Sequence, residues 1–223
     1  MTDVRGPKPG RMAPACHPPA QIPFQAPRVV SLGARARPSE PAVSEQTRLH
    51  QAFLGRVIDF LCADAGITQF VDWGCPAPGT AERVRAANAD ARFVHVAPRG
   101  AAGMLSPSGT AVVTEDGSGA DSLTRRLSTS GLVDFDEPVA VLMTRPFTAD
   151  DQPNGIGELH ALMRGGGYLA LTSTAPRRTV ERAFRPFQPI EPGVADLTWW
   201  PYPDEDVTAQ GTGILGGLGR RLR

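Results

Sequence analysis

The chain has 223 residues, with 23 basic and 23 acidic side chains and therefore no formal net charge. This balance gives no broad electrostatic attraction to nucleic acid or to an anionic membrane. No stretch approaches the roughly 18 apolar residues of a membrane span, and the N-terminus has no apolar secretory core. We therefore expect a cytoplasmic protein with no nucleic-acid and no membrane partner. Its three cysteines have no C-x-x-C spacing, so neither a disulfide framework nor a metal site is predicted.

Residues 1–43 differ in composition from the rest of the chain. They contain nine of the 22 prolines, six basic residues and two acidic residues. Proline interrupts helices and sheet ladders, and few apolar residues are left to offset the entropy cost of ordering. We expect a disordered, proline- and arginine-rich tail over 1–43 and one folded domain over 44–223. The tail is either a linker without a role or a weak tether to an acidic partner.

Helical and strand patterns alternate from residue 44 onward, with Ser44 and Thr80 as expected N-caps and Gly66 after the first helix. In chain order we expect helix 45–65, strand 68–73, helix 80–88, strand 92–97, strand 110–114, helix 120–128, strand 138–143, helix 155–164, strand 168–173, helix 177–184 and a closing hairpin from 195–202 and 211–221. Strands separated by helices form a parallel sheet, which predicts an α/β fold. Such sheets bind ligands beyond the carboxyl ends of their strands.

The loop over residues 72–80, DWGCPAPGT, follows the first strand and can be interpreted in three ways. Gly74 and Gly79 have the spacing of a phosphate loop, but Thr80 stands where that loop needs a lysine. A dinucleotide fingerprint needs a glycine where Pro76 stands, because the backbone must approach a pyrophosphate there. The third interpretation is the acidic-Gly-x-Gly turn of class I methyltransferases, which passes beneath the amino-acid part of S-adenosylmethionine.

Several segments carry a family resemblance. The stretch RLHQAFLGRVIDFLCADAGITQFVDWGCPAPGT, followed by DARFVHV, LVDFDEPVAVLM, GGGYLALTS, PFQPIEPGV and GGLGRR, resembles the actinobacterial S-adenosylmethionine-dependent methyltransferase family formerly known as a domain of unknown function. The resemblance covers residues 45–221. It implies a Rossmann-like class I methyltransferase fold, with a seven-stranded mixed sheet flanked by helices, and S-adenosylmethionine as cofactor.

The resemblance also implies site residues, although each of them has an ordinary structural interpretation as well. It places five residues at the methyl donor: Asp72, Gly74, Cys75, Asp116 and Thr144. It places two at the substrate: His50, which replaces a family asparagine, and Arg145. Asp72 could instead cap the turn, Cys75 could be a small loop residue, and Arg145 could lie on the surface. No catalytic residue is predicted, because methyl transfer depends mostly on positioning the sulfonium methyl in line with a nucleophile.

The sequence departs from the family pattern at the donor motifs. Pro76 replaces the second glycine of the turn, and Ala97, Pro98 and Arg99 supply no acid for the ribose hydroxyls. A hydrogen bond to a charged group contributes about 1.5–3 kcal/mol, so its loss lowers affinity roughly 10–100-fold. The proline-rich tail stands where the family has a segment that helps to cover the cofactor pocket.

Two functions from different classes follow. The first is methyl transfer from S-adenosylmethionine to an unknown small-molecule acceptor. The alternative is a pseudoenzyme that keeps the methyltransferase fold, has lost donor binding and acts as a binding or regulatory module with a protein partner. A weaker third option is a ligand with a phosphorylated ribose, as in NADP binders, because Arg99 replaces the acid.

Overall fold

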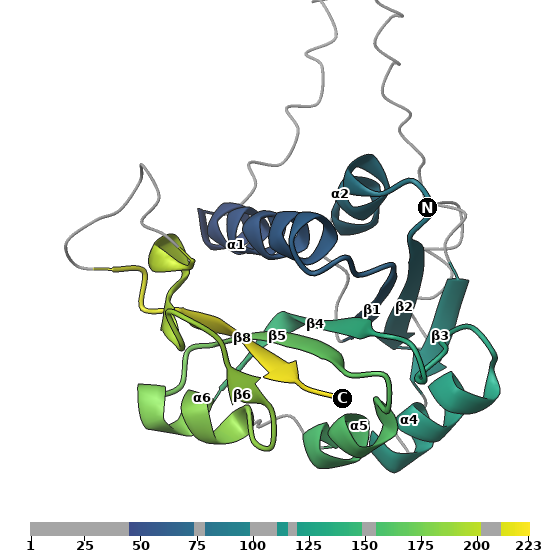
Figure 1. Cartoon of the computed structure of the whole chain (residues 1–223). Coiled ribbons are helices and arrows are strands. Elements are labelled where there is room, and N and C mark those ends of the chain that lie inside the picture. Colours follow the sequence, from purple (N-terminus) through teal and green to yellow (C-terminus); the bar gives the residue numbers. More distant parts are fainter. Residues whose placement is uncertain (1–44, 74–78, 99–110, 116–119, 149–154, 202–210) are drawn as a thin grey trace, which may run out of the picture. The chain divides into compact units, whose positions relative to one another are not determined.

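The computed structural model describes residues 45–73, 79–98, 111–115, 120–148, 155–201 and 211–223 (Figure 1). Its helices are α1 (Glu45–Ala63), α2 (Thr80–Ala87), α4 (Ala120–Thr129), α5 (Ile156–Leu162), α6 (Arg177–Ala183) and the 3-10 helix η2 (Leu197–Trp199). Its strands are β1 (Gln69–Trp73), β2 (Arg92–Pro98), β3 (Ala111–Glu115), β4 (Val139–Phe147), β5 (Gly167–Ser173), β6 (Gln188–Pro189), β7 (Ala195–Asp196) and β8 (Leu215–Arg221). None of the helices in these ranges is long and apolar enough to cross a membrane.

The strands form one mixed sheet in the order β3-β2-β1-β4-β5-β8-β6, and the two-residue strand β7 pairs with β8 beside this path. Strands β1 to β5 are parallel, whereas β8 runs antiparallel to β5, β6 and β7. The strand order reverses at β1, which lies between β2 and β4. This arrangement confirms the predicted Rossmann-like α/β fold, and it makes the carboxyl end of β1 the point where such sheets bind ligands.

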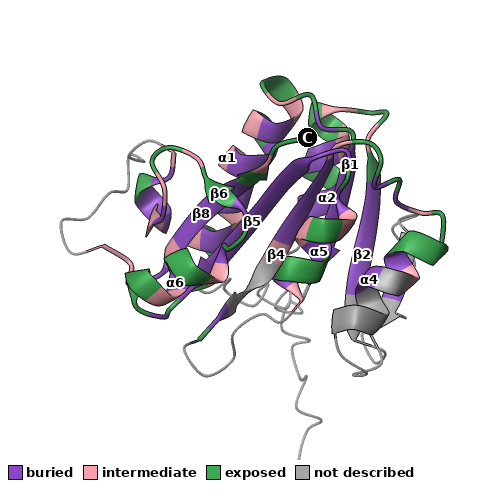
Figure 2. Ribbon diagram, turned by 60° about the horizontal axis from the view of Figure 1, so that its bottom comes forward, coloured by how far each residue is buried: buried purple, intermediate pink, exposed green. Residues whose placement is uncertain are grey.

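Both faces of the sheet are covered by helices, as expected where strands are buried on two sides. Figure 1 shows α1 and α2 on one face and α4, α5 and α6 on the other. Successive side chains of β1 point to opposite faces of the sheet. Val71 and Trp73 join the apolar cluster of the α4–α6 face, and Phe70 joins that of the α1–α2 face. Figure 2 shows the central strands as buried, and every residue of β1 and β5 is buried.

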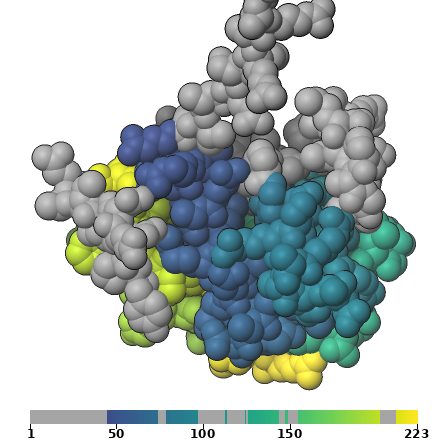
Figure 3. Space-filling model, turned by 90° about the horizontal axis from the view of Figure 1, so that it is seen from above, coloured from purple at the N-terminus to yellow at the C-terminus, as the bar shows by residue number. Residues whose placement is uncertain are grey.

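The helices α1 and α2 pack side by side over their face of the sheet (Figure 3). Their contact includes a salt bridge in which Arg83 Nη2 lies 2.5 Å from Asp59 Oδ2. The helix α1 ends before Gly66, whose φ of +64° confirms the left-handed position expected there. This conformation lets the Ile67 N–H donate to the Leu61 carbonyl at 2.9 Å and turns the chain into β1.

The predicted helices and strands up to residue 184 all occur, with ends within two residues except at β4. β4 continues to Phe147, beyond the predicted end at 143, because Phe147 pairs with Ser173 after a register shift. The Ser173 hydroxyl also donates to the Phe147 carbonyl at 2.7 Å. The N-cap of α2 is Gly79 with φ +81°, so the expected Thr80 cap is wrong, and Thr80 is the first helical residue instead. Ser44 lies outside the described residues.

The closing segment differs from the predicted hairpin. Its second arm is β8, but its first arm contains only the two residues of β7 before the chain turns into η2. The turn follows because the Asp196 side chain accepts a hydrogen bond from the Thr198 N–H and so caps η2. The strand β6, Gln188–Pro189, was not predicted because two residues carry no periodicity. Its pairing with β8 adds an edge to the sheet.

Candidate functional site

The predicted donor site lies at the carboxyl end of β1. Trp73, the last residue of β1, pairs with Val96 of β2 and Met143 of β4. The loop that follows therefore leaves the sheet at its topological switch point. Gly74, Cys75 and Pro76 of this loop lie outside the described residues, and so does Asp116, which follows β3. Their predicted roles stay predictions.

Asp72 is fully buried in β1 and forms a pair with a histidine of the neighbouring strand. Its Oδ2 lies 3.2 Å from Nδ1 of His95, which is 4% exposed and is its register partner on β2. The His95 ring also packs edge-on against Phe93 at 4.9 Å. A buried carboxylate without a polar partner would be costly, so His95 stabilises Asp72 in this position. The pair therefore fixes the Asp72 side chain against β2, one residue before the end of β1.

His50 of α1 is a third ionisable residue in this layer. Its side chain is buried, and its Nε2 has no hydrogen-bond partner among the described residues. Burial lowers the pKa of His50 to about 4, although the negative charge of Asp72 acts in the opposite direction. The imidazole is therefore neutral at pH 7. The structure thus brings His50 within electrostatic reach of Asp72, and its predicted contact with a substrate stays a prediction.

The carboxyl ends of β2, β3 and β4 hold the other candidates. Thr144 and Arg145 both belong to β4, just beyond Met143, the last β4 residue paired with β1. The side chains of Thr144 and Arg145 lie outside the description, so their predicted roles are untested. Strand β2 ends at Pro98, whose register partner on β3 is Glu115. The parallel register therefore brings an acidic residue beside the strand end that lacks one.

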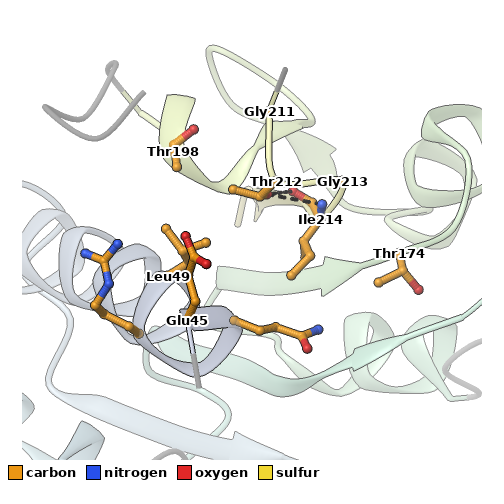
Figure 4. A pocket seen from close by; sticks show the side chains of 10 residues that line it. Glu45, Leu49, Thr174, Thr198, Gly211, Thr212, Gly213 and Ile214 are labelled. Carbon is orange, nitrogen blue, oxygen red and sulfur yellow. Dashed lines mark hydrogen bonds between the residues drawn. The ribbon is translucent and has the colours of Figure 1, made fainter. Parts of the chain in front are cut away.

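A cavity of about 640 Å³ lies between the beginning of α1 and the segment that leads into β8 (Figure 4). We call it the α1 cavity. It is lined by Glu45, Gln46, Arg48, Leu49, Thr174, Thr198, Gly211, Thr212, Gly213 and Ile214. The sequence does not indicate this cavity, because its walls come from segments more than 100 residues apart that only the fold brings together. Within the described ranges, no group of three or more His, Cys, Asp or Glu side chains could hold a metal ion.

One wall of this cavity is organised by Asp196. Its Oδ1 accepts hydrogen bonds from the Thr198 N–H at 3.1 Å and the Thr198 hydroxyl at 2.9 Å. Its Oδ2 accepts from the Thr212 N–H at 2.7 Å and the Thr212 hydroxyl at 2.9 Å. Burial favours a higher pKa for Asp196, but these four hydrogen bonds outweigh it and lower the pKa. The carboxylate therefore holds η2 and residues 211–214 together.

Comparison with known proteins identifies the family. The model of the S-adenosyl methyltransferase family matches residues 29–179. A candidate methyltransferase from Thermobifida fusca YX has a similar crystal structure, with a TM-score of 0.65 and 25% identity over 80% of this chain and 82% of that one. A DUF574 family protein from Streptomyces avermitilis MA-4680 has the same fold, with a TM-score of 0.60 and 21% identity over 78% and 83%. No curated protein matches the chain. Because the family model covers more than half of the sequence, the chain belongs to the S-adenosyl methyltransferase family.

Proposed function

We propose that the protein transfers a methyl group from S-adenosylmethionine to a small-molecule acceptor. The observation that carries the proposal is family membership. The fold supports the proposal because the sequence Asp72-x-Gly74 spans the end of β1, and β1 is where the strand order of the sheet reverses. S-adenosylmethionine would supply an electrophilic methyl carbon, to which an acceptor's lone pair would bond while the S–CH₃ electron pair goes to sulfur and S-adenosylhomocysteine leaves.

The residues of this chain would bind and orient the two reactants rather than carry the proton chemistry. The Asp72 side chain is held by His95, two residues before Gly74, at which we propose that the donor's amino-acid part binds. His50 is neutral at pH 7 and adds no positive charge beside a cationic sulfonium. Positioning of this kind accounts for a large share of the rate enhancement in bimolecular transfers.

The ribose end of the donor fits the described residues less well. Strand β2 ends in Ala97 and Pro98, which offer no carboxylate to the ribose hydroxyls. The Cα partner of Pro98 is Glu115, one strand away and therefore about 4.8 Å distant in a parallel sheet. This backbone register makes Glu115 the residue to test for the missing ribose contact.

A second candidate function is the pseudoenzyme, which two observations favour. The Asp72 carboxylate is fully buried and already paired with His95. The end of β2 lacks the acid that would hold the donor's ribose. A domain that keeps the fold but binds no donor would then act through a protein partner.

Titration calorimetry of S-adenosylmethionine and S-adenosylhomocysteine into the full chain separates the two functions. If the protein is a methyltransferase, we expect micromolar binding that Glu115→Gln weakens about 10–100-fold, the effect of losing a charge-assisted hydrogen bond. Asp116→Ala tests Asp116, the acid that the family resemblance places at the donor. Asp136→Asn is the control, because this exposed residue precedes β4 and pairs with Arg164, which precedes β5, at the opposite ends of these strands from the donor loop. Absence of heat and of a thermal shift at millimolar ligand, with a cooperative melt of the protein, would establish the pseudoenzyme instead.

A further inference from the structure

Two buried polar atoms in the layer between α1 and the sheet have no hydrogen-bond partner among the described residues. They are Nε2 of His50 on α1 and the hydroxyl oxygen of Thr172 on β5. His50 is 6% exposed and Thr172 is fully buried, so bulk water does not reach either atom. A buried polar atom without a partner costs stability, so two of them in one layer indicate a group that the ligand-free protein lacks.

Both side chains adjoin the same aromatic ring, that of Phe53. Ala170 of β5 belongs to the apolar cluster of the α1–α2 face, so Thr172, the next alternate residue, faces α1 as well. The register partner of Thr172 is Gly216, where a Cβ would lie 3.1 Å from the Phe53 ring. His50 precedes Phe53 by three residues on α1 and therefore lies on the same side of the helix.

The α1 cavity adjoins this part of the layer. Leu49, the residue before His50, lines the cavity, and so does Thr174, two residues after Thr172. Its volume of about 640 Å³ is within the roughly 300–1,000 Å³ typical of small-molecule sites. Figure 4 shows the Leu49 side chain directed toward the segment of Ile214, so an apolar surface lines the approach.

The polar group that fits this layer is uncharged and carries an oxygen atom. A buried charge needs a charged partner, and the Asp72 carboxylate is already paired with His95. Burial lowers the pKa of His50 to about 4, so its ring is neutral at pH 7, and Nε2 accepts or donates according to the tautomer. The N–H of Trp200, which also lacks a partner among the described residues of this layer, can only donate and thus needs a lone pair. A hydroxyl group both donates and accepts, so it pairs with either tautomer of His50 and with Thr172.

We propose that the α1 cavity binds a small molecule with an apolar body and a hydroxyl group, such as an alcohol or a phenol. The hydroxyl group pairs with His50 Nε2 and the Thr172 hydroxyl, and the apolar body packs on Leu49 and Ile214. That this ligand is the methyl acceptor rests on the proposed function, whereas its binding does not. The ribose of S-adenosylmethionine also carries hydroxyl groups, so the test must separate the two sources.

The test compares 4-methylphenol with p-xylene, which has nearly the same shape but no hydroxyl group, on the full chain. Titration followed by NMR should show about tenfold tighter binding of 4-methylphenol, the effect of hydrogen bonds to buried partners. His50→Phe and Thr172→Val should each weaken 4-methylphenol roughly three- to tenfold and leave p-xylene unchanged. His50→Gln keeps a polar amide and should retain the preference. His160→Phe is the control, because His160 packs against Phe187 of the other apolar cluster.

Thermal melts of the ligand-free variants give an independent readout. His50→Phe and Thr172→Val should leave the Tm unchanged or raise it, because each removes a buried polar atom that has no partner. Opposite effects on affinity and on stability distinguish a ligand-binding role from a structural one. A lower Tm in both variants would show that a bound water already satisfies the two atoms, and it would refute the site.

Each other outcome overturns a defined part of the proposal. Equal binding of 4-methylphenol and p-xylene, binding of neither at millimolar concentration, or no response to the two variants would refute the site. A repeat in saturating S-adenosylhomocysteine tests the source, because competition would assign His50 and Thr172 to the donor's own ribose. If the 4-methylphenol pattern is found and S-adenosylmethionine does not bind, the cavity site stands and the proposed function fails. Binding of S-adenosylmethionine without this pattern would leave the proposed function and refute the cavity site.

Discussion

At the scale of single residues, the layer between α1 and the sheet contains buried ionisable side chains. His50, Asp72 and His95 are all buried there, within a cluster otherwise made of apolar side chains. Asp72 and His95 satisfy each other, whereas His50 Nε2 has no partner among the described residues. A buried polar atom without a partner costs about 1–3 kcal/mol, so His50 is retained at the expense of stability.

The pH dependence of stability tests the state of His50. Its pKa is about 6.5 in the unfolded chain and about 4 in the folded protein, so the unfolded state binds more protons between these values. Its contribution to stability is therefore complete above pH 6.5 and decreases by up to about 1.4 kcal/mol per pH unit as the pH falls toward 4. We expect His50→Asn to lower this slope in urea unfolding. Burial also lowers the pKa of His160 on α5, which is less buried, so His160→Asn should lower the slope less; equal slopes in wild type and His50→Asn would contradict the prediction.

Asp196 is the residue on which the cavity wall depends. Asp196→Asn replaces one acceptor oxygen by an amide N–H₂, which cannot accept from Thr212 or Thr198. We expect a loss of about 1–3 kcal/mol, and thus a lower Tm at pH 7. Because the pKa of Asp196 is lowered, this difference should vanish as the pH falls through its folded value. Asp136→Asn, which breaks an exposed ion pair, should leave the Tm almost unchanged, and equal effects of the two variants would contradict this role.

At the scale of elements, β8 is packed closely by aromatic rings because it is rich in glycine. A Cβ on Gly219 would lie 2.8 Å from Phe184 Cδ1 and 2.9 Å from Phe187 Cβ. Gly219→Ala should therefore destabilise the protein by about 1–3 kcal/mol in denaturant unfolding. On α5 a Cβ at Gly157 would meet no atom within 4 Å, so Gly157→Ala should stabilise by about 0.4–1 kcal/mol. Similar effects of both substitutions on the free energy of unfolding would show that Phe184 and Phe187 leave room for a Cβ at residue 219.

The predictable elements are those with a full period and clear boundaries. The sequence predicts β1 because an apolar run lies between Gly66 and Gly74, and it predicts α1 because apolar residues recur at helical spacing. The short elements β6, β7 and η2 have too few residues for a period, and they form through pairing with β8 and through the Asp196 cap.

Only the part of the site that lies on one continuous segment of the chain was predictable from the sequence. The loop after β1 could be located because the switch point is a property of the strand order. The Asp72–His95 pair and the approach of Glu115 to Pro98 depend on the register between parallel strands, which the alternation of side chains does not specify. The α1 cavity depends on contacts between α1 and a segment about 165 residues later, so no local pattern indicates it.

At the scale of the whole molecule, composition and the family model place the start of the folded domain at different residues. The composition predicts a disordered tail over 1–43, whereas the family model begins to match at residue 29. All buried apolar side chains within the described ranges lie between Phe53 and Leu218.

Two truncations decide this boundary. We expect deletion of residues 1–28 and deletion of residues 1–43 to change the Tm by less than about 3 °C, because about 1 kcal/mol corresponds to roughly 2–4 °C in a chain of this size. Both variants should also keep the calorimetric response of the full chain to S-adenosylmethionine. If only the longer deletion lowers the Tm or alters this response, residues 29–43 belong to the folded domain. The family model's starting residue would then mark the boundary, because ordering a proline-rich segment requires contacts that offset its lost entropy.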